Sequence, residues 1–172
     1  MKVKVRDAES GSDLDEARRL FGEFVAWQHG RQTEHLGLVA AYFDDDAWRS
    51  EVDGLPGAYA AVEGGALLLA SLDGAAAVGC VALRQLDGES CEMKRMYVGD
   101  TGRGQGVGRA LGESVVQRAR DLGYASVLLD TSVEQHEAIG LYRSLGFEQV
   151  EPYYEVSDAM REWLVFFRLD LA

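Results

Sequence analysis

The chain has 172 residues, the usual size of one compact domain, so we expect a single domain over residues 1–172. Apolar residues make up 47% and charged residues 27% of the sequence, which excludes a disordered chain. The 29 acidic and 17 basic residues give a net charge of −12, which argues against a nucleic-acid partner and favours a cationic ligand. Surface acids that only keep the protein soluble are the simpler explanation of this charge.

The two cysteines, Cys80 and Cys91, lie in apolar stretches without a Cys-x-x-Cys spacing. Neither a zinc ribbon nor a disulfide scaffold is therefore expected. No stretch is long and apolar enough for a secretory signal or a membrane span. We expect a cytoplasmic protein with two free thiols, no metal site and no membrane partner.

The chain begins with a predicted strand and a long helix. Lys2 to Arg6 alternates charged residues with valine, as in a half-buried strand. Apolar residues then recur at near-helical spacing from Leu14 to Gln28. Ser12 and Asp15 resemble a capping pair, which would place the start of the helix there.

The next segment predicts one or two short helices, at residues 36–43 and 48–52. Three consecutive aspartates, Asp44 to Asp46, suit the positive end of a helix dipole and would mark a helix start. The alternative is that these carboxylates attract a cationic amine.

Three strands joined by tight turns follow. Apolar runs at residues 66–71, 76–86 and 91–98 are separated by Asp73-Gly74 and Asp87-Gly88. Asp-Gly between apolar runs is typical of a hairpin turn. The pattern predicts an antiparallel meander.

The second half alternates helices and strands. A helix is predicted over Gly106 to Leu122, and a second, with an apolar stripe, runs from about Ala138 to Gly146. Ser132 with Gln135 forms a second candidate capping box. The remaining strands are predicted at residues 126–129, 147–154 and 163–169. This order predicts an α/β (α+β) fold with a mixed, mostly antiparallel sheet of about seven strands and flanking helices.

The strongest chemical signal is the glycine-rich turn from Arg103 to Arg109, which lies between a predicted strand and a predicted helix. Glycines let the backbone approach a ligand, and free N–H groups at a helix start bind phosphate, so an anionic ligand needs no basic patch here. The turn does not fit the dinucleotide-binding G-x-G-x-x-G pattern and lacks the lysine of a phosphate-loop NTPase. A glycine-rich turn without a ligand is the alternative.

The turn does fit the pattern R-x-x-G-x-G, which begins at Arg103, and here the chain resembles the GNAT superfamily of acyl-CoA-dependent N-acetyltransferases. The preceding stretch, Glu92 to Val98, looks like the fourth strand of that family. Ala138 to Phe147 looks like its A-x-x-L-Y-x-x-x-G-F element. The resemblance is sharp from about Cys80 to Tyr154 and agrees in element order over the rest.

This resemblance implies transfer of an acetyl group from acetyl-CoA, the acyl-donor substrate, to a primary amine of a small molecule or peptide, by direct attack in a ternary complex. In the family, the fourth strand splays from its neighbour, its free backbone groups bind the pantetheine arm, and one N–H polarises the thioester. The glycine-rich turn holds the pyrophosphate. Carried onto this sequence, the cofactor-binding residues are Met96, Tyr97, Val98, Arg103, Gly104, Gln105, Gly106, Val107, Gly108, Arg109, Gln135 and Tyr142.

Glu92 and Tyr142 are the candidate catalytic residues that the resemblance implies. Glu92 is the candidate base, because several family members carry a catalytic glutamate there and an amine must lose a proton. Burial would raise its pKa into a useful range, whereas an ion pair with Lys94 or Arg95 would lower the pKa and indicate a structural role. Tyr142 is the candidate general acid for the departing thiolate, and the alternative is a core tyrosine of an amphipathic helix.

One position departs from the family pattern. Many relatives have asparagine where this chain has Gln135, whose amide has a different reach. His136 beside it is expected to be a solvated residue at a helix start rather than a base. The resemblance places the acceptor site at about residues 28–59 and 151–158.

Two other functions stay open from the sequence. A catalytically weak acyl-CoA-binding sensor or regulatory domain would keep the same turn, although an intact Glu92 and Tyr142 disfavour it. A transferase for a longer acyl-CoA would need space near Met93, Met96 and Leu141. The sequence names neither the acceptor amine nor an oligomeric state, and a homodimer is left open.

Overall fold

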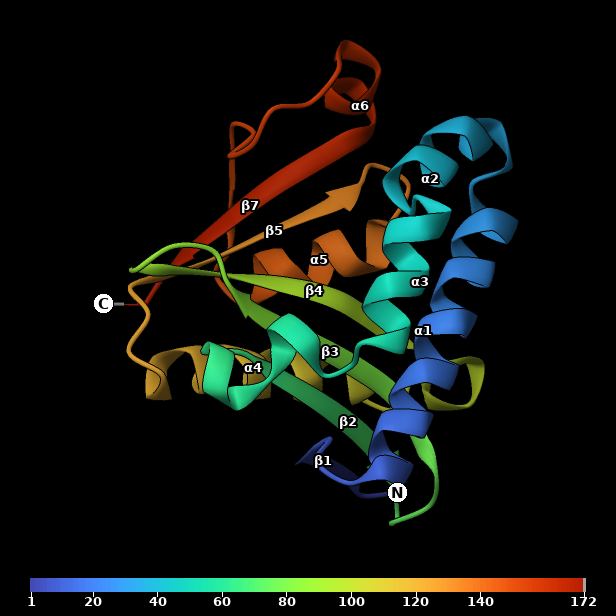
Figure 1. Cartoon of the computed structure of the whole chain (residues 1–172), viewed down its shortest axis with the longest axis vertical. Coiled ribbons are helices and arrows are strands. Elements are labelled where there is room, and N and C mark those ends of the chain that lie inside the picture. The colour runs from blue at the N-terminus through green and yellow to red at the C-terminus, as the bar shows by residue number, and fades with distance from the viewer. Residues whose placement is uncertain (172) are drawn as a thin grey trace.

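The computed structural model describes residues 1–171, which form one seven-stranded sheet with helices on both faces (Figure 1). The strands are β1 (Val3–Asp7), β2 (Ala66–Leu72), β3 (Ala77–Gln85), β4 (Ser90–Val98), β5 (Ser126–Ser132), β6 (Glu148–Val150) and β7 (Leu164–Asp170). The α-helices are α1 (Gly11–Arg31), α2 (Leu36–Tyr42), α3 (Asp45–Asp53), α4 (Val107–Asp121), α5 (His136–Ser144) and α6 (Asp158–Trp163).

The strands lie in the order β1-β2-β3-β4-β5-β7-β6. Every neighbouring pair is antiparallel except β4 and β5, which run parallel. The two Asp-Gly turns join β2, β3 and β4 into the predicted meander. The predicted mixed, mostly antiparallel sheet with flanking helices is thus confirmed.

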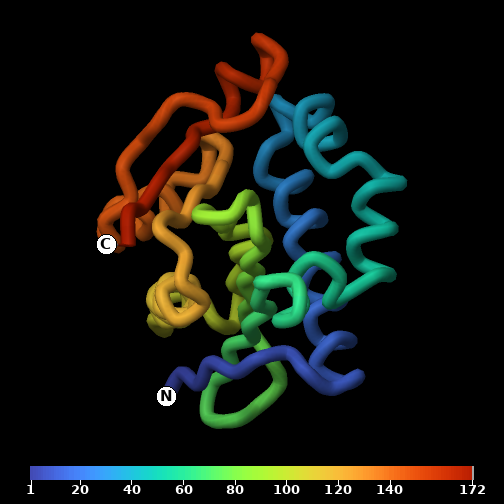
Figure 2. The backbone as a smooth tube through the Cα atoms, turned by 60° about the vertical axis from the view of Figure 1, so that its left-hand side comes forward, coloured from blue at the N-terminus to red at the C-terminus, as the bar shows by residue number. Residues whose placement is uncertain are grey.

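The sheet separates two hydrophobic layers, and Figure 2 shows the backbone of α1 on one side of the sheet and that of α4 on the other. One layer packs α4 and α5 on the sheet, with Leu111 and Val115 fully buried at its centre. The other packs α1 and α2 on the opposite face, with Leu20 and Phe21 fully buried. Each strand contributes side chains to both layers, because successive residues of a strand point to opposite faces of the sheet.

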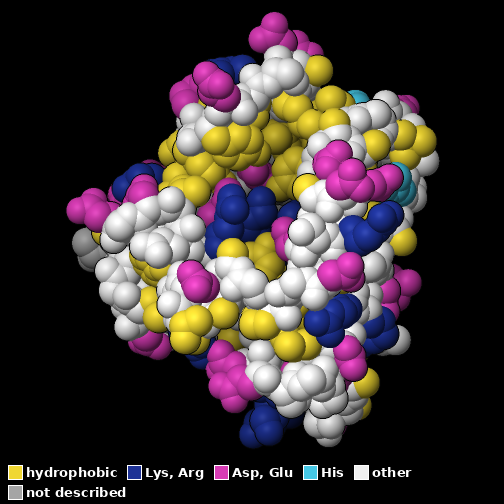
Figure 3. Space-filling view, viewed as in Figure 1, with side chains coloured by type: hydrophobic (Ala, Val, Ile, Leu, Met, Phe, Trp, Pro, Cys, Tyr) yellow, Lys and Arg dark blue, Asp and Glu magenta, His cyan; other side chains and the backbone are white. Residues whose placement is uncertain are grey.

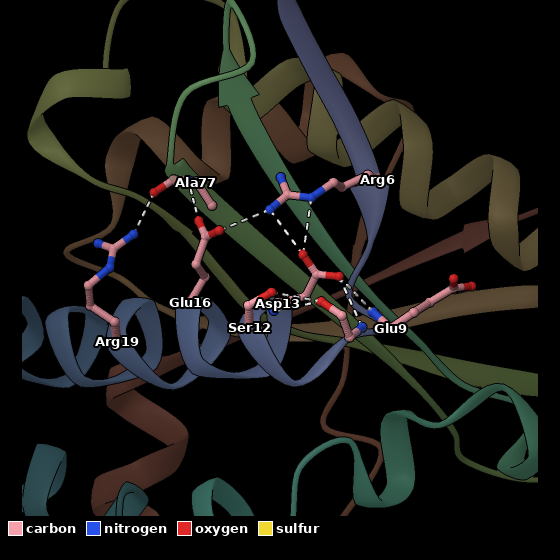
Figure 4. Close-up of polar contacts among 8 residues, drawn as sticks. Arg6, Glu9, Ser12, Asp13, Glu16, Arg19 and Ala77 are labelled. Atoms are coloured by element: carbon pink, nitrogen blue, oxygen red, sulfur yellow. Dashed lines mark hydrogen bonds and ion pairs between the residues drawn. The ribbon is translucent and has the colours of Figure 1, made fainter.

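The start of α1 is fixed by polar contacts with the sheet (Figure 4). Ser10, not Ser12, caps the helix: its hydroxyl accepts the Asp13 N–H, and the Asp13 carboxylate accepts the Ser10 N–H in return. Arg6 of β1 donates to Asp13, and Arg19 donates to the Ala77 carbonyl at 2.6 Å. The predicted capping pair is therefore wrong by two residues, although a capping box is present at the start of the helix.

Both expected C-terminal strands are present, as β6 and β7, but the first is shorter than predicted and a helix lies between them. β6 has only three residues, because Pro152 follows it and cannot donate a ladder hydrogen bond. Ser157 then caps the unpredicted helix α6, and its hydroxyl accepts the Met160 N–H at 3.2 Å. The candidate capping box at Ser132 is also wrong, since no side chain caps α5 and Gln135 is the residue before it.

Candidate active site

Strands β4 and β5 part in the middle of the sheet. They pair only where Ser90 to Glu92 meets Ser126 to Leu128. Beyond this point β4 runs on to Val98 and β5 runs on to Ser132 without pairing to each other. The parting leaves backbone N–H and C=O groups of β4 without strand partners on that side, as the family resemblance implies for this strand.

A β-bulge on the other edge of β4 turns its backbone toward the gap. Ala82 pairs with Lys94 and Cys80 pairs with Tyr97, so two residues of β4 face one residue of β3. Arg95 in the bulge has φ +59°, which is left-handed and costs a non-glycine residue about 1 kcal/mol. Its guanidinium binds both carboxylate oxygens of Glu51 at 2.8 Å and stacks 4.9 Å above Trp48, which holds the strained backbone in place.

The glycine-rich turn opens a cleft of about 420 Å³ at the start of α4. Gly104 and Gly106 have φ of +72° and +80°, which L-residues rarely adopt, and a Cβ at either would meet nothing within 4 Å. The first hydrogen bond of α4 runs from Ala110 N–H to the Gly106 carbonyl, and no side chain caps the helix. Three N–H groups at the helix start are therefore available to an anion.

Most of the predicted cofactor residues line this cleft. Gln105 is not among the lining residues, and Tyr142 lines a neighbouring cavity instead. The predicted residues that the structure brings together here are Met96, Tyr97, Val98, Arg103, Gly104, Gly106, Val107, Gly108, Arg109 and Gln135.

The cleft also has a wall that the sequence reasoning missed. Trp27 of α1 lines it, with the guanidinium groups of Arg31 and Arg103 at 5.1 and 5.3 Å from its ring. Arg31 also forms an ion pair of 2.7 Å with Glu137 of α5, which joins two helices across the mouth of the cleft. A tryptophan and an arginine one helical turn apart on α1 were the available signal.

A second, smaller cavity of about 40 Å³ lies beyond the gap between β4 and β5. Met96 and Gln135 line both this cavity and the cleft, so the two spaces meet at these residues. Aromatic side chains form much of its wall, and charged side chains lie among them. The aromatic and charged residues that line it are Phe24, Tyr42, Phe43, Lys94, Arg95, Asp130, Tyr142 and Trp163.

Glu92 is buried beside this cavity but does not line it. Its carboxylate accepts hydrogen bonds from Arg84 at 2.7 Å and from the Tyr153 hydroxyl at 2.5 Å, and Lys94 Nζ lies 3.7 Å away. Burial alone would raise the pKa of Glu92, but Lys94, Tyr153 and Arg84 outweigh it and lower the pKa. This arrangement supports the ion-pair alternative, with Arg84 in the place expected for Arg95.

Tyr142 lies where α5 faces the gap, and its ring packs on Phe147 and Phe167. It is both a core side chain and a wall of the cavity, so the two alternatives are not exclusive. Burial, reinforced by the charge of Asp130, raises the pKa of Tyr142 above its ordinary value. The hydroxyl therefore stays protonated at neutral pH and remains a donor.

Asp130 is a site residue that the sequence reasoning did not single out. Its two carboxylate oxygens accept hydrogen bonds from the hydroxyls of Tyr42, at 2.5 Å, and Tyr154, at 2.6 Å. The signal was a carboxylate in an apolar strand, VLLDTS. Next to it, the buried Thr131 hydroxyl has no hydrogen-bond partner among the described residues, although Thr131 lines the cavity.

The two segments predicted for the acceptor site both reach this region. Gln28, Tyr42 and Phe43 of the first line the cavity, and Tyr154 of the second binds Asp130. The three aspartates at 44–46 begin α3, where Asp44 accepts the Ala47 N–H at 3.1 Å. His136 is the exposed first residue of α5. No helix among residues 1–171 is long and apolar enough to cross a membrane.

Known proteins share this architecture over the whole chain. An acetyltransferase of the GNAT family from Staphylococcus aureus superposes with a TM-score of 0.74 at 19% identity, covering 99% of this chain and 100% of that one. A GNAT family acetyltransferase from Elizabethkingia anophelis, solved with acetyl-CoA bound, gives 0.60 at 17% identity and covers 98% of both chains. At these identities the likeness concerns the fold.

Sequence relatives match a shorter segment. An N-acetyltransferase of Schizosaccharomyces pombe, named as uncharacterized, is 42% identical over 91 residues, which is 52% of this chain and 56% of the yeast protein. Human N-acetyltransferase 8B is 44% identical over 77 residues, which is 42% of this chain and 34% of the human protein. The profile of the acetyltransferase (GNAT) family matches residues 6–147. The chain therefore belongs to the GNAT acetyltransferase family.

Proposed function

We propose that the protein transfers an acetyl group from acetyl-CoA to a primary amine of a small molecule or peptide. The observation that carries this proposal is the meeting of two spaces at Met96 and Gln135, where β4 and β5 part. One space has free helix N–H groups for phosphates, and the other is lined by titratable side chains. Membership of the GNAT family and the acetyl-CoA bound in the Elizabethkingia protein support the same function.

The cleft residues fit the parts of acetyl-CoA in order. The N–H groups at the start of α4 would hold the pyrophosphate, because they combine unpaired donors with the positive end of the helix dipole. The unpaired edge of β4 from Met96 to Val98 would bind the amides of the pantetheine arm. Gln135 would reach the arm through its side-chain amide.

Transfer is a direct reaction between amine and thioester. The amine nitrogen attacks the carbonyl carbon, a C–N bond forms, the C–S bond breaks, and the nitrogen loses one proton. A backbone N–H of β4 would stabilise the oxyanion, and Tyr142 would donate to the departing sulfur. Cys80 and Cys91 are buried, and burial raises the pKa of each to about 12, so an acyl-cysteine intermediate is disfavoured.

Two carboxylates compete as acceptor of the amine proton. Asp130 lines the cavity itself. Glu92 does not, and it would act through the Tyr153 hydroxyl, from which its carboxylate accepts a hydrogen bond. We favour Asp130 for direct contact with the amine and keep Glu92 as the group that positions Tyr153. The conservative variants D130N and E92Q separate them: removal of the true proton acceptor changes the pH profile of kcat, and removal of a positioning group does not.

The test of the proposed function is calorimetric titration with acetyl-CoA, propionyl-CoA and CoA, followed by a thiol-release assay over a panel of amines. Binding with amine-dependent thiol release is the expected result. Binding without release, for every amine, would instead indicate an acyl-CoA sensor. Absence of binding would overturn the assignment of the cleft.

A further inference from the structure

Two cations, Lys94 and Arg95, line the smaller cavity, and among the described residues Lys94 has no hydrogen-bond partner. It lines the cavity from β4, its side chain is only 15% exposed, and no group of residues 1–171 accepts a hydrogen bond from its Nζ. The nearest carboxylate oxygen, Oε1 of Glu92, is 3.7 Å away and already accepts from Arg84. An ammonium has three donors, and burying them without acceptors is unfavourable.

The neighbouring charged groups are all engaged. Arg95 holds both oxygens of Glu51, and both oxygens of Asp130 accept tyrosine hydroxyls. Burial lowers the pKa of Lys94, although the negative charges of Asp130 and Glu92 oppose this shift. The charges of the site are balanced, but no carboxylate accepts a hydrogen bond from Lys94, so its ammonium donors have no acceptor among the described residues.

The molecular surface has the same character. Figure 3 shows Lys and Arg side chains, with Asp and Glu side chains beside them, in a hollow over the middle of the sheet, with hydrophobic side chains at its rim. Arg84 of β3 and Lys94 and Arg95 of β4 are the basic residues of that part of the sheet.

The acceptor substrate can supply the hydrogen-bond acceptor that Lys94 lacks. The phosphates of acetyl-CoA are assigned to the start of α4, in the other space, and its arm and thioester are uncharged. The walls next to Lys94 are aromatic, since Phe24, Tyr42, Phe43 and Trp163 line the same cavity. A ligand that completes this cavity therefore combines an amine, an anionic group and an apolar body.

We propose that the acceptor is an apolar α-amino acid whose carboxylate binds Lys94 while its amine faces Asp130 and the thioester. This inference rests on the proposed function and names its substrate class. The products are the N-acetyl amino acid and CoA, with one proton released overall from the ammonium form of the acceptor. The side chain of the amino acid would lie against the aromatic wall.

The experiment compares leucine, methionine and phenylalanine with their carboxamides, which keep the amine and the side chain but lose the negative charge. The amides have a less basic amine and so more free base at a given pH, which favours them unless the carboxylate is bound. We expect kcat/KM to be about 30-fold higher for the acids, the size of one charge-assisted hydrogen bond. Equal use of the amides would overturn the inference and leave the proposed function intact.

The variant K94M tests the residue. The preference for the acids over the amides, measured as the ratio of kcat/KM, should fall about 30-fold, through KM for the acids. The matched control is K4M on exposed Lys4 of β1, which removes the same charge far from the cavity. An equal loss of kcat with every acceptor would overturn the inference, because it would place Lys94 at the thioester. Failure of every amine, despite acetyl-CoA binding, would remove the proposed function and this inference together.

Discussion

The cleft and the smaller cavity meet at Met96 and Gln135, but backbone groups form the binding surface of the first and side chains form that of the second. The cleft uses backbone: glycines with positive φ, free N–H groups of α4 and the unpaired edge of β4. The cavity uses side chains from α1, α2, β4, β5, α5, α6 and β7, and its buried charges are held by tyrosines and arginines. A backbone site needs a short sequence pattern, and a side-chain site needs the whole fold.

This difference separates recognition of a common donor from recognition of a particular acceptor. Backbone donors bind any ligand with the same phosphate and amide groups, so the cleft can stay constant while side chains in the cavity change.

Tyr142→Phe should separate chemistry from donor binding. Loss of the hydroxyl removes the donor to the departing sulfur, so kcat should fall about 100-fold, the usual scale for a general acid. The Kd for acetyl-CoA should change less than about threefold, because the ring and its packing on Phe147 and Phe167 are kept. Stopped-flow turnover and calorimetry measure the two quantities. A variant with full turnover would remove Tyr142 from the mechanism.

Glu92→Gln tests the buried charges beside the cavity. Arg84 and Lys94 lose their carboxylate partner, so the free energy of unfolding at pH 7 should fall by about 2 kcal/mol. The pKa of Glu92 is lowered below its ordinary value of 4.5, so its stabilisation is complete above that pH and is lost as pH falls through the lowered pKa. Urea melts at pH 7 and pH 3 should show the difference between variant and wild type shrinking. A constant difference would contradict the ion-pair role.

Gly106→Val tests the backbone site. A branched residue at φ +80° strains the turn and fills space reserved for a ligand, so acetyl-CoA should bind at least about 10-fold more weakly. The matched control is Gly74→Val, at φ +79° in the β2–β3 hairpin, where the strain is the same and no cleft is near. The control should lose stability and keep its Kd. Equal weakening in both variants would mean that the effect is only one of folding.

Thr131→Val has the smallest expected effect and tests whether the cavity is complete without a ligand. The buried hydroxyl has no partner among the described residues, so its replacement by an isosteric methyl should raise the free energy of unfolding by about 1 kcal/mol. Thr131→Ser, which keeps the hydroxyl, is the control. A destabilised valine variant would show that the hydroxyl is satisfied in solution.

The sequence predicts the fold well because its signals are local. The Asp-Gly turns, the alternation in β1 and the apolar stripes of α4 and α5 each depend on residues close together along the chain. The errors also have local causes: Ser10 competes with Ser12 for the cap of α1, and Pro152 ends β6 early. Helix α6 escaped notice because its apolar stripe is only one turn long.

The site is predictable only on its backbone side. The turn from Arg103 to Arg109 identifies the cleft because the glycine spacing itself encodes the geometry. The partners of Glu92 are not encoded nearby, since Tyr153 lies 61 positions along the chain and Tyr42 lies 88 positions from Asp130. Such contacts follow from strand order and from the parting of β4 and β5, which no short window of sequence contains.

Each space is lined by one of the three tryptophans: Trp27 lines the cleft and Trp163 lines the cavity. Indole emission responds to the charges and water around the ring. The protein thus carries an optical reporter for each substrate: Trp27, held between two guanidinium groups, for the donor, and Trp163, bonded to Gln32 at 2.8 Å, for the acceptor. Replacing both Trp27 and Trp48 with phenylalanine would leave Trp163 as the single indole, so entry of the acceptor could be followed by fluorescence without a label.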